Sequence, residues 1–493
     1  MMPQEWQNMG GQDCSDCSTC IRSEWALVKA FPDTADQLFQ SHWESWFTQS
    51  DVDALQQLGL NTVRIPLGFW IVEPLVDSSS EFYAKGGIKE LKRGLGQLKA
   101  AGISAILDHH AVPGVQWADN PNTGQCTSNV QFYTDANYHR ALIWAAVMTA
   151  LSHLDPDFGS VFAIEAVNEV IMDASQTPGY GDYQSNFVET VRAVELSLGV
   201  QVPGLQAAGS TTGNATTDLL QMAQELSGSN AEISQVLSDA APMLAWAMSD
   251  LGLTSSTPSS TSALYTLFMD YNWQTGDKSN PAAAAIGPQF YDNHLYYAFG
   301  GTADATTDAY LTSLCTLNRV QADAESSNSP LVFGEWSLQT EFTADDSFLV
   351  QFADAQKMAY SQGAGWIYWN FKVENSSLSG DLGRQWSYYE GISRGYFTQD
   401  PSAYHDSTVC NSYGGSSTAS SSQASSASSP ASTSSNTPST STSDSLSSSG
   451  TLSASTASVE AASSSSSTPV ASSSASTLDP AATSRLTSPS ASS

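Results

Sequence analysis

Short apolar runs alternate along the chain with longer amphipathic stretches. The runs are rich in β-branched and aromatic residues and nearly continuous in hydrophobicity, which is typical of strands buried on both faces. We expect strands over 61–68, 104–110, 161–168, 263–270, 290–297, 330–336 and 365–371. The stretches between them predict helices over 88–101, 138–154, 186–198, 309–325 and 345–362.

This alternation predicts an α/β protein with a parallel sheet, either an open doubly wound sheet or a (β/α)8 barrel. The chain has neither a GxGxxG nor a GxxxxGK[ST] loop, which weakens the nucleotide-binding doubly wound folds. Polar and ionisable residues recur at the C-terminal ends of the predicted strands, where barrel enzymes build their active sites. We therefore expect a (β/α)8 TIM barrel. With seven strands instead of eight, the chain is expected to lack the first barrel strand and to expose two unpaired edges.

The composition of the chain divides it into two parts. Residues 1–410 are expected to form the catalytic domain, with an insertion at 199–262 that is too long for a normal βα loop. We expect this insertion to be partly disordered around an amphipathic piece at 217–251. Residues 411–493 consist almost entirely of Ser, Thr, Ala and Pro, which predicts a disordered, O-glycosylated stalk or a plain flexible tail.

The charge of the chain restricts its partners. Among 493 residues there are 17 Lys plus Arg and 49 Asp plus Glu, a formal net charge of −32. A chain this acidic is repelled by nucleic acid and by anionic membranes, which leaves a neutral or cationic substrate. No run of about 18 apolar residues indicates a transmembrane helix, and neither a signal peptide nor a hydrophobic C-terminal anchor signal is visible. We expect a monomer.

Six cysteines suit disulfides formed in an oxidising compartment. Cys14, Cys17 and Cys20 crowd one stretch, whereas the other three are dispersed. A metal or iron–sulfur site on the CxxCxxC run is the weaker alternative, because no fourth ligand follows at a standard spacing. Two sequons, at Asn214 and Asn375, fit N-glycosylation of a secreted protein.

Glu169 and Glu335 are the candidate catalytic residues. Each ends a different predicted strand, and glycoside hydrolysis requires two carboxyl groups that flank one bond. The alternative is a salt bridge at the barrel rim, which is less favoured for two glutamates among polar and aromatic neighbours. Glu165 points to the same face as Glu169 but lies deeper, so we expect a structural carboxylate. A metal on His109 and His110 is disfavoured because no third ligand is evident.

Six runs of the sequence, taken in order, resemble the fungal exo-β-1,3-glucanases of glycoside hydrolase family 5. The resemblance covers about 20–410, apart from the insertion. The runs are NTVRIPLGFW at 61–70, DHHAVPGVQ at 108–116, IEAVNEV at 164–170, DNHLYYAF at 292–299, FGEWS at 333–337 and GWIYWNFK at 365–372.

The resemblance implies a retaining mechanism, with Glu169 as the general acid/base and Glu335 as the nucleophile. Asn168 would hold the sugar 2-hydroxyl, and Arg64 would keep the pKa of Glu335 low. Further site residues implied by the resemblance are His110, His294 and Tyr296 around the −1 sugar, Trp369 as a stacking platform, and Phe299, with Trp117 as a weaker partner, in an aromatic clamp. It also implies a disulfide between Cys315 and Cys410.

We therefore expect a secreted or cell-wall enzyme that releases glucose from β-1,3-glucan without a metal or other cofactor. The usual Asn-Glu-Pro reads Asn168-Glu169-Val170 here, and the usual Gly-Ala-Pro-Gly reads Ala111-Val112-Pro113-Gly114, which leaves the substrate open. The alternatives are an endo-β-glucanase, for example on β-1,6 linkages, a transglycosylase, or a catalytically inert glucan-binding wall protein.

Overall fold

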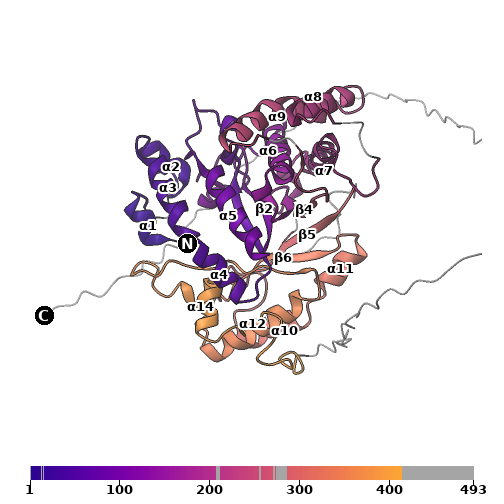
Figure 1. Ribbon diagram of the computed structural model, residues 1–493. Coiled ribbons are helices and arrows are strands. Elements are labelled where there is room, and N and C mark those ends of the chain that lie inside the picture. The colour runs from indigo at the N-terminus through magenta and orange to yellow at the C-terminus, as the bar shows by residue number, and fades with distance from the viewer. Residues whose placement is uncertain are drawn as a thin grey trace, which may run out of the picture. The chain divides into compact units, whose positions relative to one another are not determined.

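Seven parallel strands form one sheet at the centre of the computed structural model (Figure 1). The structure describes residues 2–12, 14, 16–206, 211–254, 257–269, 273 and 286–413. The strands follow one another in chain order, and the sheet curls as in a (β/α)8 barrel. They are β1 (Thr62–Gly68), β2 (Ser104–Ala111), β3 (Val161–Glu165), β4 (Tyr265–Met269), β5 (Gln289–His294), β6 (Leu331–Glu335) and β7 (Gly365–Trp366).

Among the described residues, helices connect each pair of successive strands except β4 and β5, and they surround the sheet (Figure 1), which confirms the predicted fold class. The range 309–325 was predicted as one helix and forms two, α10 and α11, because the chain turns at Thr316–Asn318. The connecting helices are α5 (Gly87–Ala101), α6 (Asp135–Leu154), α7 (Tyr180–Ser197), α10 (Thr307–Cys315), α11 (Arg319–Glu325) and α12 (Asp346–Tyr360). The short α13 (Gly383–Trp386) and α14 (Tyr388–Ser393) follow β7.

Four helices that the sequence pattern did not predict precede β1. They are α1 (Pro3–Asn8), α2 (Glu24–Ala30), α3 (Ala35–Trp46) and α4 (Gln49–Gln57). Ser23 caps α2, and Thr48 with Asp51 forms a capping box on α4, so local hydrogen bonds start these helices. Part of this region has a small hydrophobic cluster of its own, separate from the main core.

The amphipathic part of the insertion forms two helices, α8 (Ala215–Leu226) and α9 (Ala231–Asp250). Asn214 and Asn230 cap them, and their buried apolar faces pack against α6 and α7 (Figure 1). The amphipathic piece expected at 217–251 thus adds to the outer helical layer, whereas the partial disorder expected for the insertion stays a prediction. The insertion's residues 207–210 and 255–256 lie outside the described residues, as does the predicted stalk from 414 onward.

All six cysteines are paired in disulfides. The bonds join Cys14 to Cys20, Cys17 to Cys126, and Cys315 to Cys410. The CxxCxxC run therefore holds its sulfurs in disulfides and not as metal thiolates. Within the described residues, no helix is long and apolar enough to cross a membrane.

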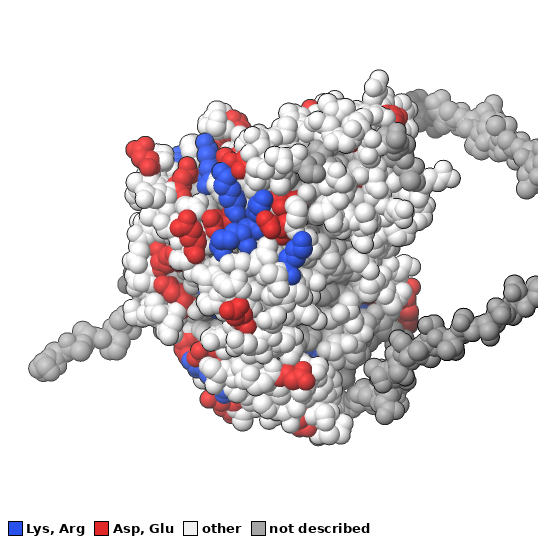
Figure 2. All heavy atoms as spheres, in the orientation of Figure 1, with Lys and Arg blue, Asp and Glu red and all other residues white. Residues whose placement is uncertain are grey.

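On the face shown in Figure 2, most Lys and Arg side chains gather over α5, whereas Asp and Glu side chains are scattered over the face. Lys89 pairs with Asp250 and Lys92 with Asp155, so these two basic side chains of α5 are neutralised locally. Much of the remaining face carries no charge. Outside the patch over α5, this face offers no basic footprint for a polyanion.

Candidate active site

The carboxyl ends of the strands bring Glu169 and Glu335 together in the fold. Glu335 is the last residue of β6, and Glu169 lies four residues beyond the end of β3. A carboxylate oxygen of each glutamate and a ring nitrogen of His294 all lie within 4.8 Å of one another. Glu169 has a positive φ of 40°, a strained backbone conformation that is often found at functional sites. Residues separated by 166 positions therefore share one site.

Arg64 on β1 is the centre of the hydrogen-bond network beneath this pair. Its Nη1 donates to Glu335 Oε1 at 2.8 Å, and its Nη2 donates to Asn168 Oδ1 at 2.7 Å. Its Nε donates to Glu165 Oε2 at 2.8 Å, and Asp108 lies 3.0 Å from Nη1. Burial opposes the charge, but these carboxylates raise the pKa of Arg64 well above its ordinary value. The guanidinium is therefore a permanent cation, held in one orientation.

Both oxygens of Glu335 are held by hydrogen bonds. Arg64 binds Oε1, and the Tyr296 hydroxyl donates to Oε2 at 2.7 Å. Burial raises the pKa of Glu335, and the neighbouring Glu169 adds to this effect, whereas His294 and Arg64 oppose it. We expected Arg64 to keep the pKa of Glu335 low. The pKa is raised instead, because burial outweighs the charge of Arg64.

His294 at the end of β5 links the two glutamates. Its Nδ1 lies 2.7 Å from Glu169 Oε1 and 3.6 Å from Glu335 Oε2. Burial alone would lower the pKa of this imidazole, but Glu335, Asp292 and the hydrogen bond to Glu169 raise it well above 6.5. His294 is thus a buried cation that stabilises negative charge on both carboxyl groups.

Glu169 and Glu335 differ in their access to solvent. The Glu169 side chain is 20% exposed, whereas that of Glu335 is 6% exposed. A general acid/base must exchange protons with the leaving group and with water, whereas a nucleophile is more reactive when water is excluded from it. The more accessible carboxyl group is therefore suited to proton transfer.

Asn168 is oriented by its neighbours. Its Oδ1 accepts a hydrogen bond from Arg64, so its Nδ2 remains available as a donor. Gln116 joins the end of β2 to the chain after β3 by donating to the carbonyls of His110 (2.7 Å) and Asn168 (3.1 Å). This arrangement presents the amide N–H groups of Asn168 to a hydroxyl acceptor.

The two adjacent histidines lie on opposite faces of β2. His109 stacks on Trp144 of α6, with ring centroids 3.9 Å apart, and burial lowers its pKa to about 3. His110 bonds Asp108 at 2.7 Å and stacks against Trp369 at 5.6 Å. His109 is therefore a neutral core residue, and only His110 and the partly exposed Trp369 belong to the site.

Phe299 is an exposed aromatic side chain beside Tyr296, the residue that donates to Glu335. It is 71% exposed, and its ring lies 5.5 Å from that of Tyr296 and 6.3 Å from that of Trp386. Trp117, which we expected as its partner, packs against the main hydrophobic core. Trp386 takes the place beside Phe299 that we expected for Trp117.

The sequence pattern did not identify several residues of the site, because their positions depend on contacts across the barrel. Met269 Sδ accepts the backbone N–H of Glu169 at 3.0 Å, and Trp273 lies edge-on to His294 at 5.6 Å. Asp292, two residues before His294, accepts from the Gly334 N–H and so links β5 to β6. Of these, only Asp292 had a sequence signal, as a buried-strand carboxylate in the DNHLYYAF run.

Glu169, His294 and Glu335 are also the residue types that bind metals. The His294 nitrogen and the Glu169 oxygen, however, lie 2.7 Å apart. Two ligands bonded tetrahedrally to one zinc ion lie about 3.3 Å apart. The observed contact therefore has the length of a hydrogen bond and fits a pair that shares a proton.

Comparison with known proteins agrees with this geometry. Residues 32–375 match the family model "Cellulase (glycosyl hydrolase family 5)". The chain belongs to glycoside hydrolase family 5.

The chain is also similar to individual proteins and to solved structures. The chain is 30% identical over 424 residues to "Glucan endo-1,6-beta-glucosidase B" of Emericella nidulans, covering 83% of this chain and 84% of the relative. It is 35% identical over 147 residues to "Probable glucan 1,3-beta-glucosidase A" of Aspergillus niger, covering 30% and 33%. A rutinosidase crystal structure from Aspergillus niger shares the fold, with a TM-score of 0.50 at 16% identity over 81% of this chain and 93% of that one.

Substitution of Arg64 should change the pH profile as well as the rate. In Arg64→Gln, Glu335 loses the cation that favours its ionised form, so its proton is retained to higher pH. We expect kcat/KM to fall about 100-fold, as for loss of one preorganised charge contact, and its acidic limb to move to higher pH. The pH dependence of kcat/KM on an aryl β-glucoside checks this.

The exposed Arg394, which pairs with Glu390 and Asp381, provides a matched control. Arg394→Gln should leave both the rate and the profile unchanged. An acidic limb that stays in place in Arg64→Gln would contradict the role of Arg64.

Proposed function

We propose that this chain is a retaining β-glucan hydrolase, with Glu335 as the nucleophile and Glu169 as the general acid/base. The observation that carries the proposal is the pair of carboxyl groups with oxygens within 4.8 Å of each other. Retaining glycosidases place their carboxyl groups about 5–5.5 Å apart, whereas inverting enzymes leave about 6.5–9.5 Å for a water molecule.

In the first step, Glu335 attacks the anomeric carbon and forms a covalent glycosyl-enzyme. Glu169 donates its proton to the glycosidic oxygen, and that bond breaks. Arg64 and Tyr296 hold the attacking carboxylate in place, and the Asn168 amide binds the 2-hydroxyl, a contact that strengthens in the transition state.

In the second step, Glu169 acts as the base. It removes a proton from a water molecule that attacks the same carbon, and the Glu335 carboxylate leaves. The sugar departs with its original anomeric configuration. His294 contacts both carboxyl groups and stabilises whichever of them is ionised at each stage.

For the substrate, we propose β-1,6-glucan cleaved within the chain. The support is the relative from Emericella nidulans, named as an endo-1,6-β-glucosidase, which aligns over 83% of this chain. The large uncharged areas on the face shown in Figure 2 suit a neutral polysaccharide. Exo-hydrolysis of β-1,3-glucan is the second candidate, favoured by the ordered motifs and by the shorter match to the Aspergillus niger protein.

Product analysis on two linear glucans separates these candidates. Pustulan (β-1,6) and laminarin (β-1,3) are incubated with the protein, and the products are followed over time. Release of β-1,6 oligosaccharides from pustulan supports the proposal, whereas glucose alone from laminarin supports the second candidate. Binding to either glucan without release of reducing sugar would indicate the inert wall protein.

Phe299 is proposed to stack on a sugar beyond the cleaved bond. In Phe299→Ala, loss of this exposed platform should raise KM for a glucan oligosaccharide about tenfold, because aromatic contacts contribute about 0.5–1.5 kcal/mol. Turnover of β-glucosyl fluoride, whose leaving group is too small to fill that subsite, should stay unchanged.

The control is Tyr389→Ala, an aromatic side chain that is also exposed, at 53%, and packs on Phe371. It should alter neither kinetic constant. Equal losses of Phe299→Ala on the oligosaccharide and on β-glucosyl fluoride would place Phe299 outside the subsite.

A further inference from the structure

The backbone that carries Glu169 lies in a turn whose polar groups are held by side chains from elsewhere in the chain. The turn follows β3, and the positive φ of 40° at Glu169 is unfavourable for a residue with a side chain. Such a conformation persists only where the surrounding structure holds it in place. The contacts on either side of Glu169 therefore determine where its carboxyl group lies.

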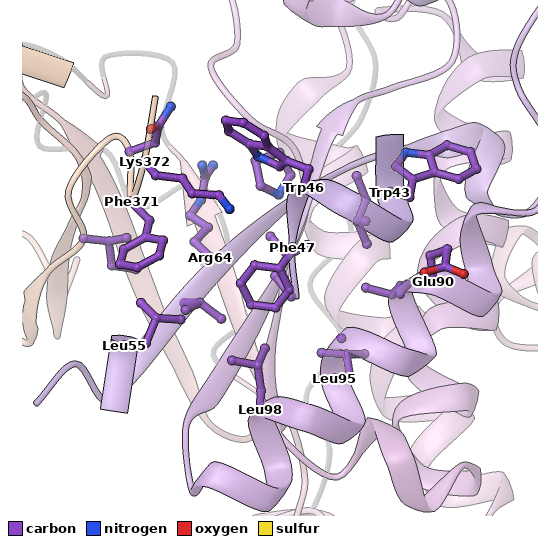
Figure 3. Close-up of a pocket in the computed structure, with 18 of the residues that line it drawn as sticks. Trp43, Trp46, Phe47, Leu55, Arg64, Glu90, Leu95, Leu98, Phe371 and Lys372 are labelled. Atoms are coloured by element: carbon purple, nitrogen blue, oxygen red, sulfur yellow. The ribbon is translucent and has the colours of Figure 1, made fainter. Parts of the chain in front are cut away.

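Arg64 fixes Glu335 and the side chain of Asn168 from β1. It lines the pocket shown in Figure 3 and donates a hydrogen bond to each of these two residues. The backbone N–H of Glu169, the next residue in the chain, donates instead to Met269 Sδ at the end of β4, at 3.0 Å. The backbone at Glu169 therefore has an anchor that is separate from Arg64.

Tyr133 anchors the same turn on the side of β2. It is buried and lies in the loop between β2 and α6. Its hydroxyl accepts a hydrogen bond from the backbone N–H of Ile171 at 2.8 Å and donates to the backbone carbonyl of Gln116 at 3.1 Å. The Gln116 side chain in turn donates to the Asn168 carbonyl at 3.1 Å. The chain on both sides of Glu169 is thus tied to one loop.

Trp273 anchors the turn on the side of β4. Its indole Nε1 donates to the backbone carbonyl of Val170 at 2.8 Å, and both residues are buried. Its ring lies edge-on to His294, with ring centroids 5.6 Å apart, and His294 Nδ1 lies 2.7 Å from Glu169 Oε1. Trp273 therefore contacts both the backbone beside Glu169 and the imidazole that holds its carboxyl group.

The order of the strands explains why the anchors come from both sides. The order in the sheet is β2-β3-β4, so the chain segments that follow β2 and β4 flank the turn that follows β3. Tyr133 comes from the first of these segments and Trp273 from the second. Both are buried aromatic side chains, and close packing leaves such side chains little freedom to move. Each anchor therefore has a fixed position from which to hold the turn.

We propose that Tyr133 and Trp273 are positioning residues that hold the turn at Glu169 so that its carboxyl group reaches the glycosidic oxygen. This inference rests on the proposed function of Glu169 as the general acid/base. Neither aromatic residue takes part in the chemistry itself, because each acts through a hydrogen bond to the backbone next to Glu169. Loss of either hydrogen bond should therefore impair proton donation and leave the attack by Glu335 intact.

Two conservative variants test this proposal through the leaving group of the substrate. Tyr133→Phe and Trp273→Phe keep an aromatic ring but remove the hydroxyl or the indole N–H. On β-glucan, whose leaving oxygen requires a proton, kcat/KM should fall at least about tenfold in each variant, because a small displacement of a reacting group can lower the rate about 100-fold. On a dinitrophenyl β-glucoside, whose leaving group requires no proton, kcat/KM should stay within about twofold.

Matched controls lose the same chemical groups away from the turn. The Tyr138 hydroxyl donates to the Pro178 carbonyl at 2.9 Å, and the Trp6 indole donates to the Ile21 carbonyl at 3.1 Å. Tyr138→Phe and Trp6→Phe should change kcat/KM on neither substrate. The ratio of the two kcat/KM values does not depend on how much of a variant is folded, so a loss of stability alone leaves this ratio unchanged.

Three outcomes decide the proposal, with Glu169→Ala measured alongside. A loss on β-glucan alone supports the positioning role of the residue that was changed. Equal losses on both substrates, or no loss on either, would overturn that role and leave the proposed function intact, provided that Glu169→Ala separates the two substrates. If Glu169→Ala does not separate them, Glu169 is not the general acid, and the proposed function and this inference both fail.

Discussion

Glu335→Ala is expected to lower kcat on β-glucan and on aryl β-glucosides by about 10⁵-fold, as for removal of a nucleophile that acts as one unit with its partners. The loss should be equal on natural and activated substrates, because neither can form the glycosyl-enzyme without the carboxylate. Steady-state rates on both substrates measure it. Glu341→Ala, which removes an exposed carboxylate from the segment after β6, should be fully active.

Azide should restore activity to Glu335→Ala with a diagnostic product. The small anion can enter the space left by the carboxylate and attack the anomeric carbon directly. One displacement inverts the configuration, so the expected product is an α-glycosyl azide. A β-glycosyl azide, or wild-type activity without azide, would exclude Glu335 as the nucleophile.

Glu169→Ala is expected to separate substrates by their leaving groups. Hydrolysis of β-glucan should fall at least about 10³-fold, since the leaving sugar oxygen requires a proton. Dinitrophenolate leaves without a proton, so the glycosyl-enzyme should form from a dinitrophenyl glycoside at nearly the normal rate. It should then accumulate, and dinitrophenol should be released in a burst. Stopped-flow measurement of released dinitrophenol checks this.

Azide also tests the role of Glu169 as the acid/base, because azide replaces water in the second displacement. The product from Glu169→Ala should be the β-glycosyl azide, with two inversions and net retention. Glu165→Gln is the matched control, since Glu165 is fully buried and burial raises its pKa well above the usual carboxyl range. If Glu165→Gln showed the burst and Glu169→Ala did not, the acid/base assignment would move to Glu165.

The sheet was predictable because its strands are apolar on both faces. Residues 104–110 and 330–336 were predicted within two residues of β2 and β6, which are central strands with neighbours on both sides. The seventh strand was predicted as 365–371, but pairing ends at Trp366, at the open edge of the sheet. Strand pairing requires a neighbouring strand, and a hydrophobic pattern does not predict where such a neighbour is missing.

The meeting of Glu169 and Glu335 was predictable for a different reason. Parallel strands place their C-terminal ends on one rim, so Glu169 and Glu335 could be brought together without knowledge of the helices. The pKa of Glu335 could not be predicted, because it depends on the balance of burial against Arg64 and His294. Trp386 was missed because it comes from a short helix after the last strand, where no periodic pattern identifies it.

Trapping of the covalent intermediate tests the central claim most directly. A dinitrophenyl 2-deoxy-2-fluoro-β-glycoside forms the glycosyl-enzyme normally but hydrolyses it slowly, so the modified protein can be digested and sequenced by mass spectrometry. The two-glutamate mechanism predicts a single label on Glu335. A label on Glu169 or Glu165, or no label on a protein that hydrolyses glucan with inversion, would contradict it.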